Sequence, residues 1–98
     1  MRNGMPATHP GEHLRDELDW LGMSANAFAA ALGVPTNRIT GILNGTRAIS
    51  ADTALRLARY FGTTAQFWLN LQNELDLREM KMKIAPELER INVYSHSA

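Results

Sequence analysis

Apolar residues recur along this chain at helical spacing, in segments that turn residues separate. Leu14, Leu18 and Leu21 fall at i, i+4 and i+7, which places them on one face of a helix. Hydroxyl residues or prolines that can start a helix precede the segments, and all but the last close on a glycine that can end one. The expected helices run from Pro10 to Gly22, from the cap Ser24 to Gly33, from Pro35 or Thr36 to Asn44 and Gly45, from the cap Ser50 to Gly62, and from Thr64 into the charged residues 78–83.

Residues 24–43 have the spacing of a helix-turn-helix, with the tight turn at Gly33. In the second of these helices, Ile39, Ile42 and Leu43 share one face and are expected to point inward. The opposite face is small, polar and free of acidic residues, which suits the base edges of a DNA major groove. That face carries Asn37, Thr40, Gly41 and Asn44.

Gly41 needs a reason of its own, because a glycine in an exposed helix costs about 1 kcal/mol relative to alanine. A close approach to DNA would explain Gly41, and neutral drift would also explain it. A plain helical hairpin in a small bundle is the alternative reading of the whole segment.

The last long helix is apolar around more than one face, through residues that include Leu69 and Leu77. A helix of this kind needs more than one surface to bury against. One side can close the core, and we expect the other to meet a second copy of the chain, since paired DNA half-sites match a two-fold protein axis. The alternative is that the tail covers it. The expected dimer interface consists of Phe67, Trp68, Leu71 and Leu75.

The ends of the chain lack this periodicity. Residues 1–9 are expected to form a flexible N-terminus, and residues 10–84 the DNA-binding and dimerisation domain. Pro86 breaks the pattern of the last helix, which leaves residues 85–98 as a C-terminal tail. That tail is either a short helical turn followed by a small strand at residues 91–94, or a disordered end. Together the segments predict an all-α chain.

The formal net charge is zero, with ten basic and ten acidic residues, but the charges are unevenly placed. Residues 10–19 hold four acidic residues and one basic residue, a net charge of −3. Residues 36–59 hold four arginines and one aspartate, a net charge of +3. Because phosphates respond to the local field, this basic segment is compatible with DNA binding, and Asn26 and Arg47 are candidate phosphate contacts. The acidic segment is then free for another partner.

Trp20 lies off the leucine stripe of its helix. Exposed tryptophans often mark contact sites, so Trp20 is either part of an interaction surface or folded back under the last long helix.

Several kinds of chemistry are excluded or disfavoured. The chain has no cysteine, so a disulfide, a thiolate ligand and a cysteine nucleophile are all impossible. His9 and His13 share a helical face but lack a third metal ligand nearby, and no metal or cofactor is expected. Ser24 and Ser50 are better explained as helix caps than as nucleophiles, and there is no glycine-rich phosphate loop. We therefore expect a protein that is not an enzyme.

No apolar run approaches the roughly 18 residues of a membrane span. The N-terminus also lacks the apolar centre of a signal peptide. The expectation is a cytoplasmic protein with no membrane partner.

Four stretches together resemble one family. These are HPGEHLRDEL at 9–18, the helix-turn-helix, LNGTRAISADTALRLARYFG at 43–62 and FWLNLQ at 67–72. They are similar to the HigA-type antitoxins, a branch of the phage-repressor-like helix-turn-helix superfamily. The fold that this resemblance implies is an all-α, five-helix phage-repressor-like domain with an extended fifth helix and a short C-terminal tail.

The resemblance implies a homodimeric antitoxin that neutralises a small basic toxin, a ribosome-dependent ribonuclease of the RelE type. Similar proteins also repress their own operon by binding operator DNA. Carried over position by position, the base-reading residues would be Thr36, Asn37, Arg38, Thr40 and Asn44, with phosphate contacts from Asn26 and Arg47.

Two alternatives keep the helix-turn-helix but change the partner. A stand-alone phage-type repressor would share the DNA chemistry and lack the toxin, whereas a pure protein-binding scaffold would show no salt-dependent DNA binding. The surface that grips a toxin also stays open. It is either the N-terminal residues with the acidic first helix, or the C-terminal segment.

Overall fold

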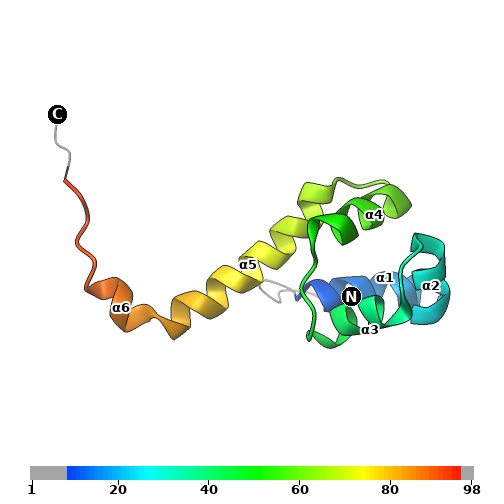
Figure 1. The fold of residues 1–98 in the computed structure, drawn as a ribbon, viewed down its shortest axis with the longest axis horizontal. Coiled ribbons are helices and arrows are strands. Elements are labelled where there is room, and N and C mark those ends of the chain that lie inside the picture. Colours follow the sequence, from blue (N-terminus) through cyan, green and yellow to red (C-terminus); the bar gives the residue numbers. More distant parts are fainter. Residues whose placement is uncertain (1–8, 96–98) are drawn as a thin grey trace.

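Helices account for most of residues 9–95, the part of the chain that the computed structural model describes. No strand occurs among these residues. Helices α1 to α4 and the start of α5 form a compact head, and the rest of α5 and α6 extend away from it (Figure 1). The helices are α1 (Pro10–Leu21), α2 (Ala25–Leu32), α3 (Thr36–Asn44), α4 (Ala51–Phe61), α5 (Ala65–Lys83) and α6 (Ala85–Glu89).

Helix starts follow the predicted caps. The hydroxyls of Ser24, Ser50 and Thr64 each accept a hydrogen bond from the backbone N–H three residues later, at 3.1, 3.3 and 3.1 Å. These bonds satisfy backbone donors that a helix leaves without an internal partner. Helix α2 ends at Gly33, whose φ of 76° lies in the left-handed region that other residues adopt only at a cost.

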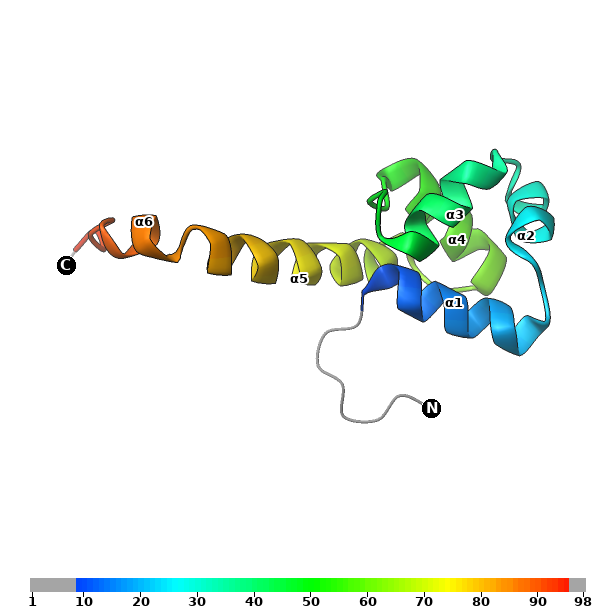
Figure 2. The same cartoon turned by 90° about the horizontal axis from the view of Figure 1, so that it is seen from below.

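The core of the head combines buried side chains from α1 to α5. Leu14, Phe28, Ile39, Leu57 and Trp68 are all essentially inaccessible to solvent. Figure 2 shows α1 packed along the underside of α3 and the first turns of α5. The predicted inward face of α3 is confirmed, whereas the predicted stripe of α1 holds only in part. Leu21, its last member, is 44% exposed because the helix ends there.

The prediction that Trp68 contributes to a dimer interface is wrong. Trp68 is 1% exposed, and its indole N–H donates to the hydroxyl of Thr63 at 3.0 Å. Its ring packs beside the ring of Phe61, with centroids 5.7 Å apart. The first turns of α5 form one side of the core. Trp68, the largest side chain of those turns, lies inside the core. Phe67 is 37% exposed, and Leu71 is partly buried against the core.

The second half of α5 leaves the head, and the molecule measures 54 × 26 × 24 Å. Apolar side chains on this projecting segment face solvent, including Leu77 at 71% and Met82 at 77% exposure. A short turn at Ile84 then leads into α6. The helical turn expected in the tail is therefore present, but the strand expected at residues 91–94 is not, since these residues follow α6 without regular structure. Residues 1–8, predicted to be flexible, and residues 96–98 lie outside the described residues.

Candidate DNA-binding surface

The predicted base-reading residues lie on α3, and the predicted phosphate contacts Asn26 and Arg47 lie at the start of α2 and in the loop after α3. Asn26, Asn37, Asn44 and Arg47 are exposed, and none of the other three is fully buried. The three half-buried members are Thr36, Arg38 and Thr40. The structure thus presents the predicted face to solvent, in a helix held from behind by the buried Ile39 and Ile42.

The first turns of α2 and α3 are joined by one hydrogen bond between predicted contact residues. The hydroxyl of Thr36 donates to Oδ1 of Asn26 at 2.7 Å. In the turn, the N–H of Val34 donates to the carbonyl oxygen of Ala29 at 3.0 Å, which holds the turn onto the end of α2. The start of α3 is therefore tied to the start of α2 by a side-chain bond, and the turn between them is tied to α2.

Arg38 is held by an ion pair that the sequence analysis missed. Its guanidinium donates to Oδ1 of Asp52, at the start of α4, at 2.9 Å. Arg56 donates through Nε to the same oxygen at 2.8 Å. The hydrogen bond from Arg56 lowers the pKa of Asp52 most, partly opposed by burial, and the charges of Arg56 and Arg38 lower it further.

Arg56 is also a link between helices rather than a side chain that points to solvent. Its NH1 group donates at 2.7 Å to the carbonyl oxygen of Leu32, at the end of α2. Two of the four arginines in the basic segment 36–59 are thus engaged within the chain, while Arg47 and Arg59 stay exposed. The i, i+4 spacing of Asp52 and Arg56 was the available signal for this network.

Gly41 has an explanation within its own chain. Its carbonyl oxygen accepts hydrogen bonds from the N–H groups of Thr46 and Arg47, at 2.9 and 3.1 Å. A Cβ atom at position 41 would lie 3.0 Å from the Cβ of Arg47. The loop after α3 can therefore fold back tightly onto the helix, which places Arg47 beside the predicted base-reading face.

The N-terminus of α1 rests on the C-terminus of α3, and this contact accounts for the HPGE sequence. His9 caps α1, because its Nδ1 accepts a hydrogen bond from the N–H of Gly11 at 2.7 Å. A Cβ atom at Gly11 would collide with the carbonyl oxygen of Ile42 and with the ring of His9. The same ring lies against Gly45, the residue that ends α3. His9, considered as a possible metal ligand, has a structural role instead.

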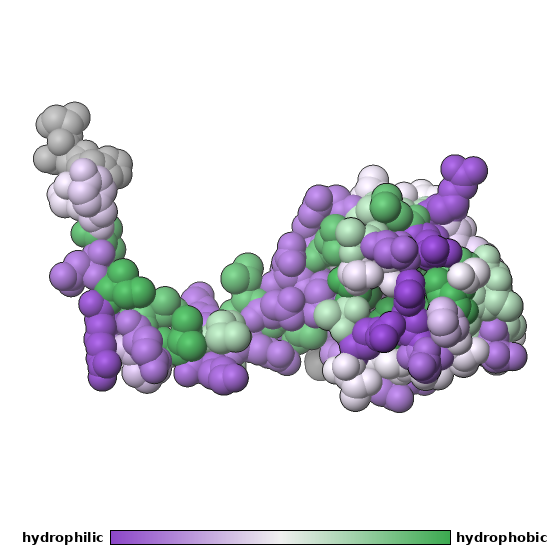
Figure 3. Space-filling view, in the orientation of Figure 1, coloured by the Kyte–Doolittle hydropathy of each residue, from purple (hydrophilic) through white to green (hydrophobic). Residues whose placement is uncertain are grey.

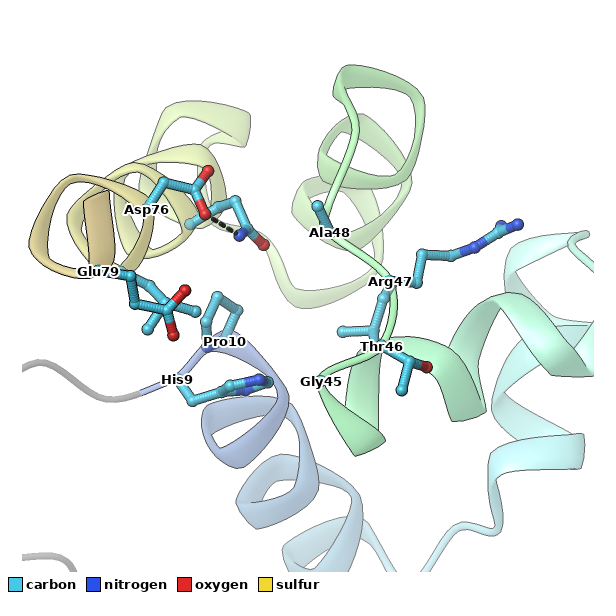
Figure 4. A pocket seen from close by; sticks show the side chains of 11 residues that line it. His9, Pro10, Gly45, Thr46, Arg47, Ala48, Asp76 and Glu79 are labelled. Atoms are coloured by element: carbon cyan, nitrogen blue, oxygen red, sulfur yellow. Dashed lines mark hydrogen bonds between the residues drawn. The ribbon is translucent and has the colours of Figure 1, made fainter. Parts of the chain in front are cut away.

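A cleft of about 230 Å³ separates this corner from α5 (Figure 4). His9, Gly45 and Thr46 line one side, and Asp76 and Glu79 line the other. The Arg47 side chain points away from it.

Among residues 9–95, no cluster of three His, Asp or Glu side chains could bind a metal ion. Over the same residues, no helix has the length and apolar character required to cross a bilayer.

Gln72 also lines the cleft and joins the loop to α5. Its Oε1 accepts a hydrogen bond from the N–H of Ile49 at 3.0 Å, and its Nε2 donates to Asp76 at 2.9 Å. Sequence reasoning missed this residue, although Gln72 follows the buried Trp68 by four positions and so shares its face.

Comparisons with known proteins extend the likeness over most of the chain. The helix-turn-helix family matches residues 14–68. Virulence-associated protein I of Dichelobacter nodosus is 56% identical over 78 residues, which cover 79% of this chain and 72% of that protein. An uncharacterised HTH-type transcriptional regulator of Escherichia coli is 40% identical over 87 residues, 86% of this chain and 77% of the relative. Antitoxin HigA-1 of Vibrio cholerae is 36% identical over 78 residues, 79% of this chain and 73% of the antitoxin.

Two solved structures share the fold closely. An addiction module antidote protein of the HigA family from Coxiella burnetii superimposes with a TM-score of 0.87 and 52% identity, covering 92% of this chain and all of that one. The antitoxin HigA of Pseudomonas aeruginosa, solved with the higBA promoter, gives a TM-score of 0.86 and 42% identity, covering 91% of this chain and 99% of that one.

Proposed function

The chain belongs to the helix-turn-helix family and, within it, to the HigA-type antitoxins. On that premise we propose that it is a cytoplasmic protein that represses its own operon. This is a family of DNA-binding regulators and antitoxins rather than of enzymes. The operator is bound by two copies of α3, one from each protomer of a dimer. The same dimer neutralises a basic ribonuclease toxin of the RelE type.

One observation carries the DNA-binding part of the proposal. The outer face of α3 offers amide, hydroxyl and guanidinium groups, while its inner face is locked into the core by Ile39 and Ile42. Asn37 and Asn44 on this face can make paired hydrogen bonds to an adenine edge. The exposed Arg47 beside it can contact a phosphate and fix the register of α3.

Selection from a pool of random duplexes tests this part directly. We expect the protein to enrich one sequence with two-fold symmetry, and to bind it with an affinity that falls as salt rises. A shuffled duplex of the same composition is the control. Equal affinity for the selected and shuffled duplexes would show that α3 does not read bases.

The dimer is proposed to form through the projecting part of the molecule. In Figure 3, apolar surface, coloured green, extends along the projecting segment of α5 and over α6. Leu77, Met80, Ile84 and Leu88 line a groove of about 600 Å³ where α6 bends away from α5. A second copy of this segment would remove these side chains from water, whereas one chain alone leaves them exposed. Pairing at this place keeps both reading faces clear of the contact.

Phe67, Leu71 and Leu75 remain candidates for the part of this interface closest to the head. Leu71 and Leu75 are half-buried in the single chain, so they can supply only its edge. The exposed apolar groups further along α5 and α6 would form its centre.

The toxin is proposed to bind the acidic side of α1. Glu12, Asp16 and Asp19 are exposed there, and Trp20 at its end is 87% exposed. Acidic groups beside an exposed indole suit a basic protein, since the ring can also take a cation on its face. Co-purification with the product of a short adjacent open reading frame tests this. We expect Trp20→Ala to weaken the complex while Trp20 contributes little to folding.

A stand-alone regulator is the second candidate, favoured by the Escherichia coli relative that is named as a transcriptional regulator. Both functions use the same DNA-binding surface. Absence of a basic protein that co-purifies with the chain, together with selective DNA binding, would favour the regulator.

A further inference from the structure

Asp52 is an acidic residue in a region where acidic residues are otherwise missing. No other aspartate or glutamate occurs between Asp19 and Glu74, a stretch that contains α2, α3 and α4. Acidic groups near DNA repel phosphates, so a surface selected only for affinity would lack Asp52. Its presence beside Arg38 therefore requires a reason other than attraction to DNA.

Asp52 is not the only group that fastens Arg56. Arg56 is also bound to the carbonyl oxygen of Leu32 at 2.7 Å, and so is anchored at a second point. Arg38 is different, because within residues 9–95 its one side-chain hydrogen bond is the bond to Asp52. Asp52 thus decides where the Arg38 guanidinium lies, while it shares the orientation of Arg56 with α2.

Arg38 lies in the first turn of α3, next to Asn37, where side chains reach base edges in helix-turn-helix proteins. A free arginine at this place would attract any phosphate, whatever the base sequence. An arginine held through one nitrogen keeps its charge, which the neighbouring carboxylate partly offsets, and it keeps other N–H donors for a partner that meets it in the held orientation. Restraint of this kind disfavours wrong duplexes more than the right one.

We propose that Asp52 sets the DNA selectivity of this protein by holding Arg38 in one orientation on the reading helix. This inference rests on the proposed DNA-binding function and adds to it a positioning residue that does not itself need to touch DNA. Asp52 lowers the affinity for all duplexes and lowers it least for the operator, which offers Arg38 a partner in the held orientation.

The test compares affinities for the duplex selected by the wild-type protein and for a shuffled duplex, over a series of salt concentrations. With Asp52→Asn we expect about three- to tenfold tighter binding to the shuffled duplex. The slope of the logarithm of affinity against the logarithm of salt concentration should become steeper by about one. The ratio of the two affinities should fall. Glu17→Gln, which makes the same charge change on α1, should leave the ratio unchanged.

Two further variants distinguish the restraint of the Arg38 side chain from a general effect of the Asp52 charge on DNA binding. Asp52→Glu keeps the charge but moves the carboxylate, and we expect it also to lower the ratio. In an Arg38→Gln background, Asp52→Asn should have no further effect on the ratio, because the side chain to be restrained is gone. Circular dichroism establishes that each variant folds. Should Asp52→Asn not fold, Asp52→Glu decides the question alone.

The proposal would be overturned if Asp52→Glu left the ratio of the two affinities unchanged. It would also be overturned if Asp52→Asn raised the affinity for both duplexes equally, whether Arg38 is present or replaced. Either result leaves the DNA-binding function standing, since the wild-type protein still selects a sequence. If the wild-type protein enriches no sequence from the random pool, the proposed function fails, and the role of Asp52 fails with it.

Discussion

The backbone N–H of Ile49 donates a 3.0 Å hydrogen bond to Oε1 of Gln72, and so joins the loop behind the reading helix to α5. Ile49 is 4% exposed, which leaves its N–H poorly placed to find water instead. The helix proposed to carry the dimer contact thus also supports the loop that places Arg47. In the proposed function, DNA reading and pairing would both depend on this helix.

Gln72→Leu should destabilise the head, because it leaves the N–H of Ile49 without an acceptor. We expect a loss of about 1–3 kcal/mol, the usual cost of an unsatisfied buried donor. Urea unfolding followed by circular dichroism measures it. Gln66→Leu, on the exposed side of the same helix, is the matched control and should change stability by less than about 0.5 kcal/mol. Equal effects of the two variants would contradict the role given to Gln72.

Gly11→Ala should destabilise the chain more than Gly22→Ala. The new methyl group at position 11 would overlap the carbonyl oxygen of Ile42, and α1 would have to move away from α3. We expect about 1–3 kcal/mol or more for such overpacking. At Gly22 nothing lies within 4 Å, and only the left-handed backbone is strained, at about 1–2 kcal/mol. Thermal unfolding of both variants provides the comparison, and a smaller loss at position 11 would contradict the close helix contact.

Met80→Glu should yield monomers that keep the head intact. Met80 is 49% exposed on the projecting segment, so a charge there affects the proposed partner contact and not the core. Sedimentation equilibrium reports the association state, and thermal unfolding reports the head. Trp68→Glu should instead unfold the chain, since the indole is in the core. Asn73→Glu, exposed on the same helix, controls for the added charge. A Met80→Glu protein that remains dimeric would place the interface elsewhere.

Asn37→Ala should abolish the preference for the selected duplex and leave folding unchanged. The side chain is exposed, and a lost paired contact to a base costs about 1–3 kcal/mol of discrimination. Fluorescence anisotropy with the selected and shuffled duplexes measures the ratio of affinities. Asn73→Ala removes an exposed amide on α5 instead and should keep that ratio. Intact selectivity in Asn37→Ala would refute the assigned reading face.

The stabilising effect of Asp52 should depend on pH. Pairing with Arg56 and Arg38 lowers the pKa of Asp52 below its ordinary value of 3.8 in the folded chain. A group with a lowered folded pKa stabilises the folded state above the ordinary pKa and loses this effect as the pH falls through the lowered value. The stability difference between wild type and Asp52→Asn should therefore be present at neutral pH and disappear on acidification below 3.8. Urea midpoints across a pH series test this, and a constant difference would contradict it.

Local features of the chain could be predicted from the sequence because their physical causes act within a few residues. The caps Ser24, Ser50 and Thr64 bond to N–H groups three positions away, and the leucine and isoleucine spacing sets each helix face. The outer face of α3, with Asn37 and Asn44, follows from the same spacing.

The contacts that hold this face in place depend instead on how the helices cross, which spacing along the chain does not specify. Arg38 meets Asp52 across 14 positions, and Ile49 meets Gln72 across 23. The inward direction of Trp68 was likewise decided by the packing of α5 on the head, because an all-round apolar helix offers no single face to predict. The sequence by itself thus determined which helices form and which side of α3 is polar. Tertiary packing alone decided which charges are restrained and which apolar surface remains for a partner.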